Sequence, residues 1–189
     1  HSNENEDHSF KRPKELEAEI LRFQNNKEKW IAFIGLKDGQ PYEIFTGIAD
    51  EEMFPIPKTI NKGVIIKKRD AEGNSRYDFQ FTDRFGYRKN IEGLSHMFNK
   101  EFWNYAKLIS SVLRHNMPLE YAVNLVSSLR FDNDYINTWK VGVERALKKY
   151  IPDGTKAKNG LKCMRCESIS LVYQEGCLIC QDCGHSKCG

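Results

Sequence analysis

The sequence lacks any hydrophobic run long enough to cross a membrane, and it has little excess charge of either sign. Its longest apolar run, from Trp30 to Gly35, is far shorter than the roughly 20 residues of a membrane-spanning helix. Its 29 basic and 26 acidic residues leave a formal net charge of +3, whereas proteins dedicated to nucleic acids or membrane surfaces usually have a strong basic excess. We therefore expect neither a membrane protein nor a nucleic-acid-binding one.

Cysteine is absent from the first 162 residues, and all six cysteines lie between Cys163 and Cys188. Disulfides that stabilise a secreted domain of this size are not distributed in this way. The first residues, HSNENEDH, also lack the apolar segment of a signal peptide. We therefore expect a cytoplasmic protein with a metal-binding or thiol-exchange module. Because the chain begins with His1 rather than Met, we also expect it to be a piece of a longer protein.

Motifs of several enzyme classes are missing as well. The sequence contains no Gly-rich phosphate loop, no G-x-S-x-G elbow and no HExxH motif. His96 and His115 have no cysteine or second histidine at ligand spacing, so we interpret both as structural. With 40% hydrophobic residues in 189, the chain can nevertheless bury one ordinary core and carry a small appendage.

The first half of the chain predicts a mostly antiparallel sheet. Two strand-favouring runs, 30–36 and 42–48, flank Asp38-Gly39, a dipeptide suited to a tight hairpin turn. Tyr77, Phe79 and Phe81 alternate with polar residues, and we interpret these rings as core rather than as a base-stacking platform. Further strands are expected at 64–68 and 87–91.

Other segments of the first half predict different structure. Residues 1–12 are expected to be a disordered tail, and 51–58, which carries two prolines, an irregular loop. Over 13–25 we expect a short helix, with Leu16, Ile20 and Leu21 on one face.

Three helices are expected after residue 98, where the hydrophobic period becomes helical. Asn99 is placed to cap the first, Pro118 to begin the second and Asp134 to cap the third, which Pro152 would stop. The predicted fold class is therefore α+β, with a mostly antiparallel sheet followed by three helices and a zinc-ribbon-like tail. We expect an accessory domain over 13–152, a linker over 153–160 and a cysteine-rich tail over 161–189.

The tail carries C-x-x-C pairs, the unit from which tetrahedral zinc sites are built. Pairing Cys180 with Cys183 leaves 13 residues after Cys166, which is close to the gap of a zinc ribbon, and Gly184 would close that turn. Pairing Cys177 with Cys180 leaves only 10 residues and remains an alternative. The preferred zinc ligands are Cys163, Cys166, Cys180 and Cys183.

Two thiols remain beyond the four that a zinc ion needs. Under the preferred assignment they are Cys177 and Cys188, and under the alternative they are Cys183 and Cys188. A mobile pair of thiols suits thiol–disulfide exchange, and Lys187 would help to hold Cys188 as a thiolate. The alternative interpretation is a zinc ribbon that binds nucleic acid or protein without redox chemistry.

Several segments resemble one known family. The run Phe10 to Gly47, the helical segment Asn104 to Val126, and TWKVGVERALKKYIPDGTKAK with the tail EGCLICQDCGHSKCG are similar to the C-terminal region of adenosylcobalamin-dependent (class II, vitamin B12-dependent) ribonucleotide reductases. These oxidoreductases convert ribonucleotides into deoxyribonucleotides for DNA synthesis. The resemblance covers nearly the whole chain.

The resemblance implies an accessory fragment without the catalytic barrel, in which the cobalamin radical chemistry of the parent enzyme takes place. Adenosylcobalamin is therefore expected in the parent enzyme and not on this fragment. The resemblance also implies that tail cysteines, with Cys177 and Cys188 as candidates, reduce the active-site disulfide and are reset by a thioredoxin-like reductant. The implied partners are that reductant and the catalytic barrel of the same chain.

Overall fold

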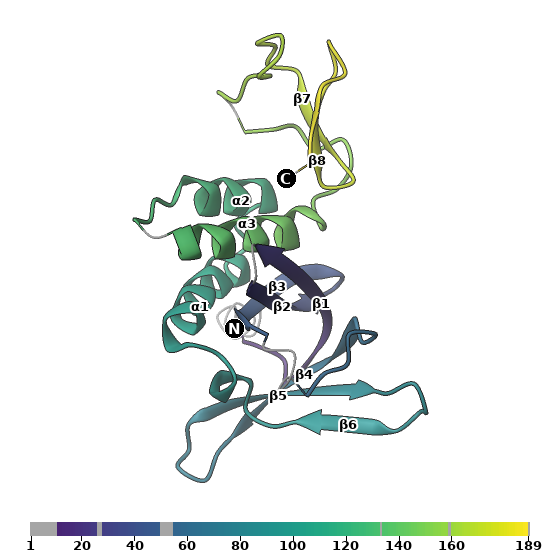
Figure 1. Cartoon of the computed structure of the whole chain (residues 1–189), viewed down its shortest axis with the longest axis vertical. Helices are drawn as coiled ribbons and strands as arrows, with labels where there is room; N and C mark the ends of the chain where they lie inside the picture. The colour runs from purple at the N-terminus through teal and green to yellow at the C-terminus, as the bar shows by residue number, and fades with distance from the viewer. Residues whose placement is uncertain (1–10, 26–27, 50–54, 133, 159, 189) are drawn as a thin grey trace, which may run out of the picture. The chain divides into compact units, whose positions relative to one another are not determined.

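The computed structural model describes residues 11–25, 28–49, 55–132, 134–158 and 160–188, arranged as two structural units, 1–116 and 117–189. The first unit contains one six-stranded antiparallel sheet, with the strand order β3-β2-β1-β4-β5-β6 (Figure 1). The strands are β1 (Glu15–Asn25), β2 (Glu28–Lys37), β3 (Gln40–Ile48), β4 (Lys62–Arg69), β5 (Ser75–Thr82) and β6 (Arg88–Ile91). With the three helices that follow, the sheet confirms the predicted α+β class.

The helix predicted over 13–25 is wrong, because this segment is β1, at the centre of the sheet between β2 and β4. Leu16, Ala18 and Ile20 are buried, and the residues between them are glutamates. This ELEAEI run alternates with the period of a strand. The glutamates favour helix by propensity, but burial on a sheet outweighs that weak preference.

The hairpin between β2 and β3 forms as predicted. Asp38 and Gly39 have φ angles of 53° and 76°, the left-handed pair that a two-residue turn requires between twisted strands. A bulge between Gly35 and Leu36 then shifts the register, so that Leu36 faces Pro41 near the start of β3.

The strand β2 is buried on both of its faces, since every residue from Trp30 to Ile34 is 1% exposed or less. On one face, the Trp30 ring meets Phe102 edge-on at 4.8 Å. On the other, Phe33 packs against Phe79 and Phe98 at 4.9 and 6.0 Å. The hydrophobic core therefore lies on both sides of this part of the sheet.

The aromatic residues of β5 belong to this core, as expected. Phe79 is fully buried and Phe81 is 5% exposed, within a cluster that also holds Leu94 and Phe98. Tyr77 is half-buried and lies 6.1 Å from Trp103. The Phe79 and Phe81 rings are therefore not available as a surface on which bases could stack.

The helix α1 (Lys100–Arg114) runs along β3, with the short 3-10 helix Leu94–His96 before it. The Asn99 side chain accepts a hydrogen bond from the Glu101 amide and caps α1 as predicted. Ser110 of α1 is buried, and its hydroxyl accepts from the Ile44 amide at 3.0 Å and lies 3.2 Å from the Ile44 carbonyl. The Ser110 hydroxyl, which also donates to the Ala106 carbonyl at 2.8 Å, thus satisfies the Ile44 amide at the edge of β3 that no further strand pairs.

The second unit contains α2 (Leu119–Ser128), α3 (Asp134–Lys148) and a three-stranded antiparallel sheet. Its strands are β7 (Leu171–Gln174), β8 (Cys177–Cys180) and β9 (Ser186–Lys187). Part of the segment predicted as a linker, 153–160, is paired with β7, because Gly154 and Ala157 donate backbone hydrogen bonds to Tyr173 and Leu171. No helix in the described ranges is long and apolar enough to cross a membrane.

The predicted disordered tail, 1–12, falls mostly outside the described residues, as do the first residues of the predicted loop 51–58. Arg12, however, is described and buried. Its guanidinium donates two hydrogen bonds to the Glu43 carboxylate, at 2.9 and 2.6 Å. Both side chains are almost completely shielded from solvent, so Arg12 is part of the folded first unit.

Candidate metal centre and cysteine pair

Four thiols of the tail converge on one point. The sulfurs of Cys163, Cys166, Cys180 and Cys183 all lie within 4.8 Å of one another. Cys163 Sγ is 3.6 Å from Cys183 Sγ, and Cys166 Sγ is 3.5 Å from Cys180 Sγ. The structure thus brings together the four cysteines that the sequence favours as ligands, and His185 is not part of this group.

The two C-x-x-C turns have the same backbone geometry. In the first, the Cys163 carbonyl accepts from the Glu167 amide, and the Cys163 amide donates to Ser168. In the second, Cys180 makes the equivalent bonds with Gly184 and His185. The residue that closes each turn has a left-handed backbone, with φ of 61° at Glu167 and 75° at Gly184. Two equal turns facing each other form the framework of a four-thiolate site.

Backbone amides near the sulfurs change the acidity of the thiols. Amide hydrogen bonds from Cys183 and Asp182 lower the pKa of Cys180 to about 7. The Cys166 amide is likewise the main reason why the pKa of Cys163 is lowered. At Cys166 the Ser168 amide lowers the pKa, but burial and the neighbouring thiols raise it to about 12. In the first turn, Cys163 is therefore more readily present as a thiolate than Cys166, and in the second turn Cys180 is acidified.

The spacing of the sulfurs fits a tetrahedral zinc ion. With Zn–S bonds of about 2.3 Å, the sulfurs of such a site are about 3.8 Å apart, and the two closest pairs here are 3.6 and 3.5 Å apart. Four sulfurs and no oxygen ligand also favour a thiophilic metal over magnesium or calcium. The cluster could therefore hold a metal ion of the zinc type.

The remaining two cysteines, Cys177 and Cys188, form a disulfide. In the antiparallel register of β8 and β9, Leu178 lies opposite Lys187. Cys177, which precedes Leu178, therefore faces Cys188, which follows Lys187. Their Cα atoms are 4.1 Å apart. Cys183, the other partner considered for Cys188, lies with the four-thiol group instead.

A shallow hollow of about 310 Å³ lies beside Cys188. Arg145, Lys148 and Lys149, at the end of α3, line it together with Glu175. Burial lowers the pKa of Lys148, and repulsion from Lys187 adds to this effect against the attraction of Glu144. Positive charge therefore predominates beside Cys188, the exposed end of the disulfide, whereas the sequence had suggested a cation there only at Lys187.

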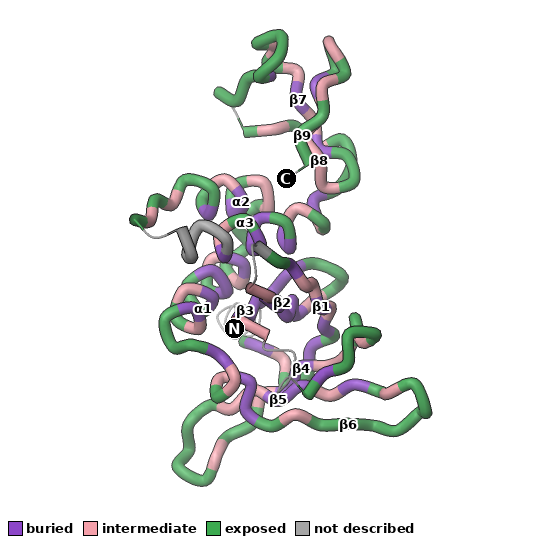
Figure 2. The backbone as a smooth tube through the Cα atoms, viewed as in Figure 1, coloured by how far each residue is buried: buried purple, intermediate pink, exposed green. Residues whose placement is uncertain are grey.

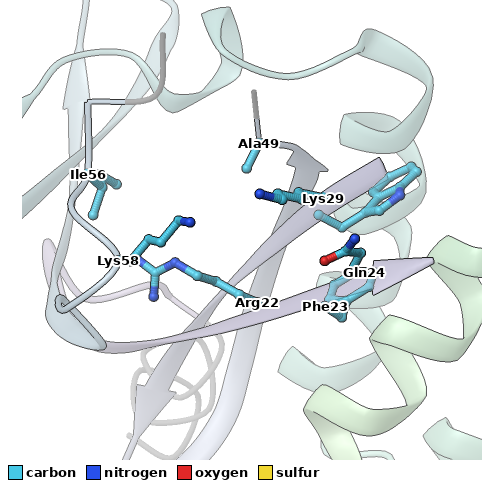
Figure 3. A pocket seen from close by; sticks show the side chains of 8 residues that line it. Arg22, Phe23, Gln24, Lys29, Ala49, Ile56 and Lys58 are labelled. Carbon is cyan, nitrogen blue, oxygen red and sulfur yellow. The ribbon is translucent and has the colours of Figure 1, made fainter. Parts of the chain in front are cut away.

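A second hollow of about 310 Å³ lies in the first unit, where β1 and β2 meet the segment 55–58. Figure 3 shows the charged ends of Arg22, Lys29 and Lys58 around it. Arg22 already donates to Asn61 and to the Pro57 carbonyl, at 3.2 and 3.0 Å. The residues around this hollow therefore attach a loop to the sheet, through the hydrogen bonds of Arg22.

The buried pair formed by Arg12 and Glu43 was not found from the sequence. Arg12 stands in a polar, charged segment, and Glu43 is the only acidic residue of a strand that is otherwise apolar or uncharged. This single carboxylate in an otherwise uncharged strand could have indicated a buried ion pair, because a buried charge needs a partner.

Comparison with known proteins identifies the family. The family model described as the NrdJ homologue C-terminal domain matches residues 16–152, from β1 to the end of α3 and a few residues beyond. The chain matches no curated protein and no solved structure. NrdJ is the vitamin B12-dependent class II ribonucleotide reductase. The match covers most of the chain, and the protein therefore belongs to the family of C-terminal domains of NrdJ homologues.

Proposed function

We propose that the tail of this domain relays electrons to the active-site disulfide of a B12-dependent ribonucleotide reductase in the cytoplasm. The exchanging pair is Cys177 and Cys188, and a thioredoxin-like dithiol protein reduces it again. Zinc occupies the other four thiols, Cys163, Cys166, Cys180 and Cys183, and holds the tail in its folded form. Adenosylcobalamin belongs to the catalytic barrel of the parent enzyme.

The observation that carries this proposal is the division of six cysteines into four converging thiols and one separate disulfide. A zinc ribbon needs only four ligands. A cross-strand disulfide that is partly accessible, as at Cys188, is of the kind used for exchange rather than for stapling a core.

In the reductive step, the Cys188 thiolate attacks one sulfur of the active-site disulfide, and a mixed disulfide forms while the other active-site sulfur leaves as a thiolate. Cys177 then attacks Cys188, which releases the second active-site thiol and leaves the tail oxidised. Two electrons and two protons have passed to the active site. The reductant reverses the change by the same two exchanges and becomes a disulfide itself.

The arrangement around the pair supports this order of attack. Cys188 is exposed, whereas Cys177 is half-buried, so an incoming partner reaches Cys188 first. Lys187 is the neighbouring residue, and Lys148 and Arg145 line the hollow beside it. Cationic side chains stabilise a thiolate and lower the pKa of its thiol.

The test combines the zinc content and the native thiol titre of one reduced, anaerobic sample. We expect one zinc ion per chain and two thiols that react without denaturation. Cys177→Ser and Cys188→Ser should each remove the exchangeable pair and keep the zinc. Cys166→Ser is the matched control, because it should reduce zinc retention and leave the disulfide able to form.

The second measurement is oxidation followed by reduction with thioredoxin. Recovery of two reactive thiols per chain, with zinc still bound, is the expected result. If zinc is retained but the chain has no pair that thioredoxin can reduce, the relay is wrong, and a zinc-ribbon module that binds a partner without redox chemistry becomes the better explanation.

A further inference from the structure

The first unit contains a larger cavity, of about 550 Å³, that takes no part in the thiol chemistry. It lies between α1 and the strands β3, β4 and β5. Its volume is in the usual range for small-molecule sites.

Three cationic side chains from two elements line this cavity: Lys67 of β4, and Lys107 and Arg114 of α1. Within the described part of the chain, none of the three has an acidic group within ion-pair distance. The one acidic residue of the lining, Glu43, is held by Arg12 in two hydrogen bonds. The cavity therefore has a surplus of positive charge that its own carboxylate offsets only in part.

Arg114 adds a specific polar atom to this surplus. Its Nε is buried and has no hydrogen-bond partner among the described residues. A buried N–H donor without a partner is unfavourable, and native structures rarely leave one unsatisfied. A ligand oxygen would supply the missing acceptor.

Aromatic side chains also line this cavity. Trp103 stacks on Phe45 at 4.7 Å with 15° between the ring planes, and Tyr77 lies 5.0 Å from Phe45. Unlike the core residue Trp30, Trp103 is only partly buried. It therefore offers ring surface to a ligand, as aromatic residues do when planar bases stack on them.

From this combination we propose that the cavity binds a nucleotide, with its phosphates on Lys67, Lys107 and Arg114 and its base against Trp103 and Tyr77. The ionisation of Lys67 is consistent with this. Burial lowers the pKa of Lys67, and repulsion from Arg114 and Arg12 lowers it further. A bound phosphate would relieve that repulsion.

The test measures binding of adenosine diphosphate, adenosine and inorganic phosphate to the full 189-residue chain by calorimetry and tryptophan emission. We expect adenosine diphosphate to bind at one site and to weaken with salt. Adenosine lacks the phosphate contacts and inorganic phosphate lacks the base contacts, so each should bind at least about tenfold more weakly than adenosine diphosphate. Emission should change because Trp103 lines the cavity, whereas Trp30 and Trp139 are buried in the core.

The variants Lys67→Gln and Lys107→Gln should each weaken binding about tenfold, since a charge-assisted hydrogen bond is lost in each. Lys107 is exposed on α1, so its variant should unfold at the same temperature as the parent chain. Lys89→Gln, on exposed β6, is the matched control and should leave the affinity unchanged.

Three results would overturn the proposal. The first is the absence of saturable binding by adenosine diphosphate. The second is equal weakening by Lys89→Gln, which would mean that only the net charge matters. The third is binding of adenosine or inorganic phosphate as tight as that of adenosine diphosphate, which would mean that the cavity does not recognise phosphate and base together.

Discussion

Asp78 is a fully buried carboxylate that joins three segments of the first unit. It accepts from the Gly93 amide at 3.0 Å and from the Arg76 guanidinium at 3.0 and 2.9 Å. Lys68 lies 3.7 Å away. The Arg76 and Lys68 side chains reach solvent, so water can replace the contacts that they make with Asp78. The buried Gly93 amide cannot be solvated in this way, and its contact is the most difficult to replace.

Asp78→Ala should therefore lower the free energy of unfolding by about 2–4 kcal/mol, because it leaves a buried amide without an acceptor and creates a small void. Asp78→Asn, which can keep the acceptor oxygen, should lose less. Glu92→Ala removes an exposed carboxylate nearby and should have almost no effect. Chemical denaturation of the three variants measures the differences, and an unchanged Asp78→Ala would contradict this role.

Glu167 adopts a backbone conformation that glycine takes more easily, with φ of 61°. Glu167→Gly should stabilise the metal-bound tail by up to about 1 kcal/mol through relief of that strain. At the equivalent turn, Gly184→Ala should destabilise it by a similar amount. Competition with a chelator should show slower zinc loss in the first variant and faster loss in the second; the same direction in both would contradict the equivalence of the turns.

The lowered pKa of Cys180 contributes to the pH dependence of the metal site. The amides of Cys183 and Asp182 bring it from 9.0 to about 7, so this thiolate stabilises the metal-free tail fully above pH 9 and loses that effect as the pH falls through about 7. Since zinc binds thiolates and displaces protons, we expect zinc affinity to fall steeply below pH 7. Chelator competition at pH 6, 7 and 8 measures it, and a constant affinity would refute the prediction.

At the scale of elements, the position of β3 is constrained because the Phe98 ring packs closely against its backbone at Gly47. A Cβ atom built on Gly47 would lie 1.9 Å from the Phe98 ring. No rearrangement of β3 alone can remove that overlap, because its register with β2 also places Phe45 opposite Phe33 in the core.

Gly47→Ala should therefore destabilise the first unit by about 1–3 kcal/mol, as overpacking does in well-filled cores. The double variant Gly47→Ala with Phe98→Leu should lose less than the sum of the single variants, because the smaller side chain leaves room for the added methyl group. Thermal unfolding of the four proteins in this cycle gives the coupling, and strict additivity would show that the two residues do not meet.

Some elements could be predicted from sequence because their signals are local. The Asp38-Gly39 turn and the Asn99 cap depend on residues adjacent in the chain, and both form as expected. The identity of β1 was missed because its glutamates favour helix, while its strand state depends on neighbours far away in sequence. Local propensity cannot represent such pairing.

The same distinction holds for the sites. The gap between the C-x-x-C pairs and the glycine after Cys183 favoured the four cysteines that converge, although spacing left a second pairing open. The cavity lined by Lys67, Lys107 and Arg114 has no spacing pattern, because its cations come from elements separated along the chain. The partner of Glu43 could not be identified either, since Arg12 lies 31 residues away.

At the scale of the whole molecule, the first unit and the cysteine tail, which is the last part of the second unit, differ in what keeps them folded. The first has an extensive aromatic core, whereas the buried cluster of the tail consists of Cys163, Leu171 and Cys180 with three partly buried neighbours. A core this small does not usually hold a fold without a metal or crosslinks.

Removing the metal should therefore unfold β7, β8 and β9 and leave the six-stranded sheet intact. Amide hydrogen exchange after chelation measures this, and protection should be lost over 163–187 but kept in β1 and β2. Reduction of the disulfide at Cys177 and Cys188 with the metal retained is the control and should affect protection only near those residues. Loss of protection throughout the chain would show that the units do not fold separately.

The hydroxyl of Ser110 has a consequence for the protein in crowded solution. An open sheet ends in strands with unpaired backbone groups, which can pair with another chain and begin aggregation. At β3 the Ile44 amide and carbonyl already have Ser110 as their neighbour. At the opposite margin, β6 has only four residues, two of them Arg88 and Lys89, and it is largely exposed (Figure 2). One margin is thus blocked at Ile44 by a side chain, and the other is short and positively charged, which disfavours pairing with a second molecule.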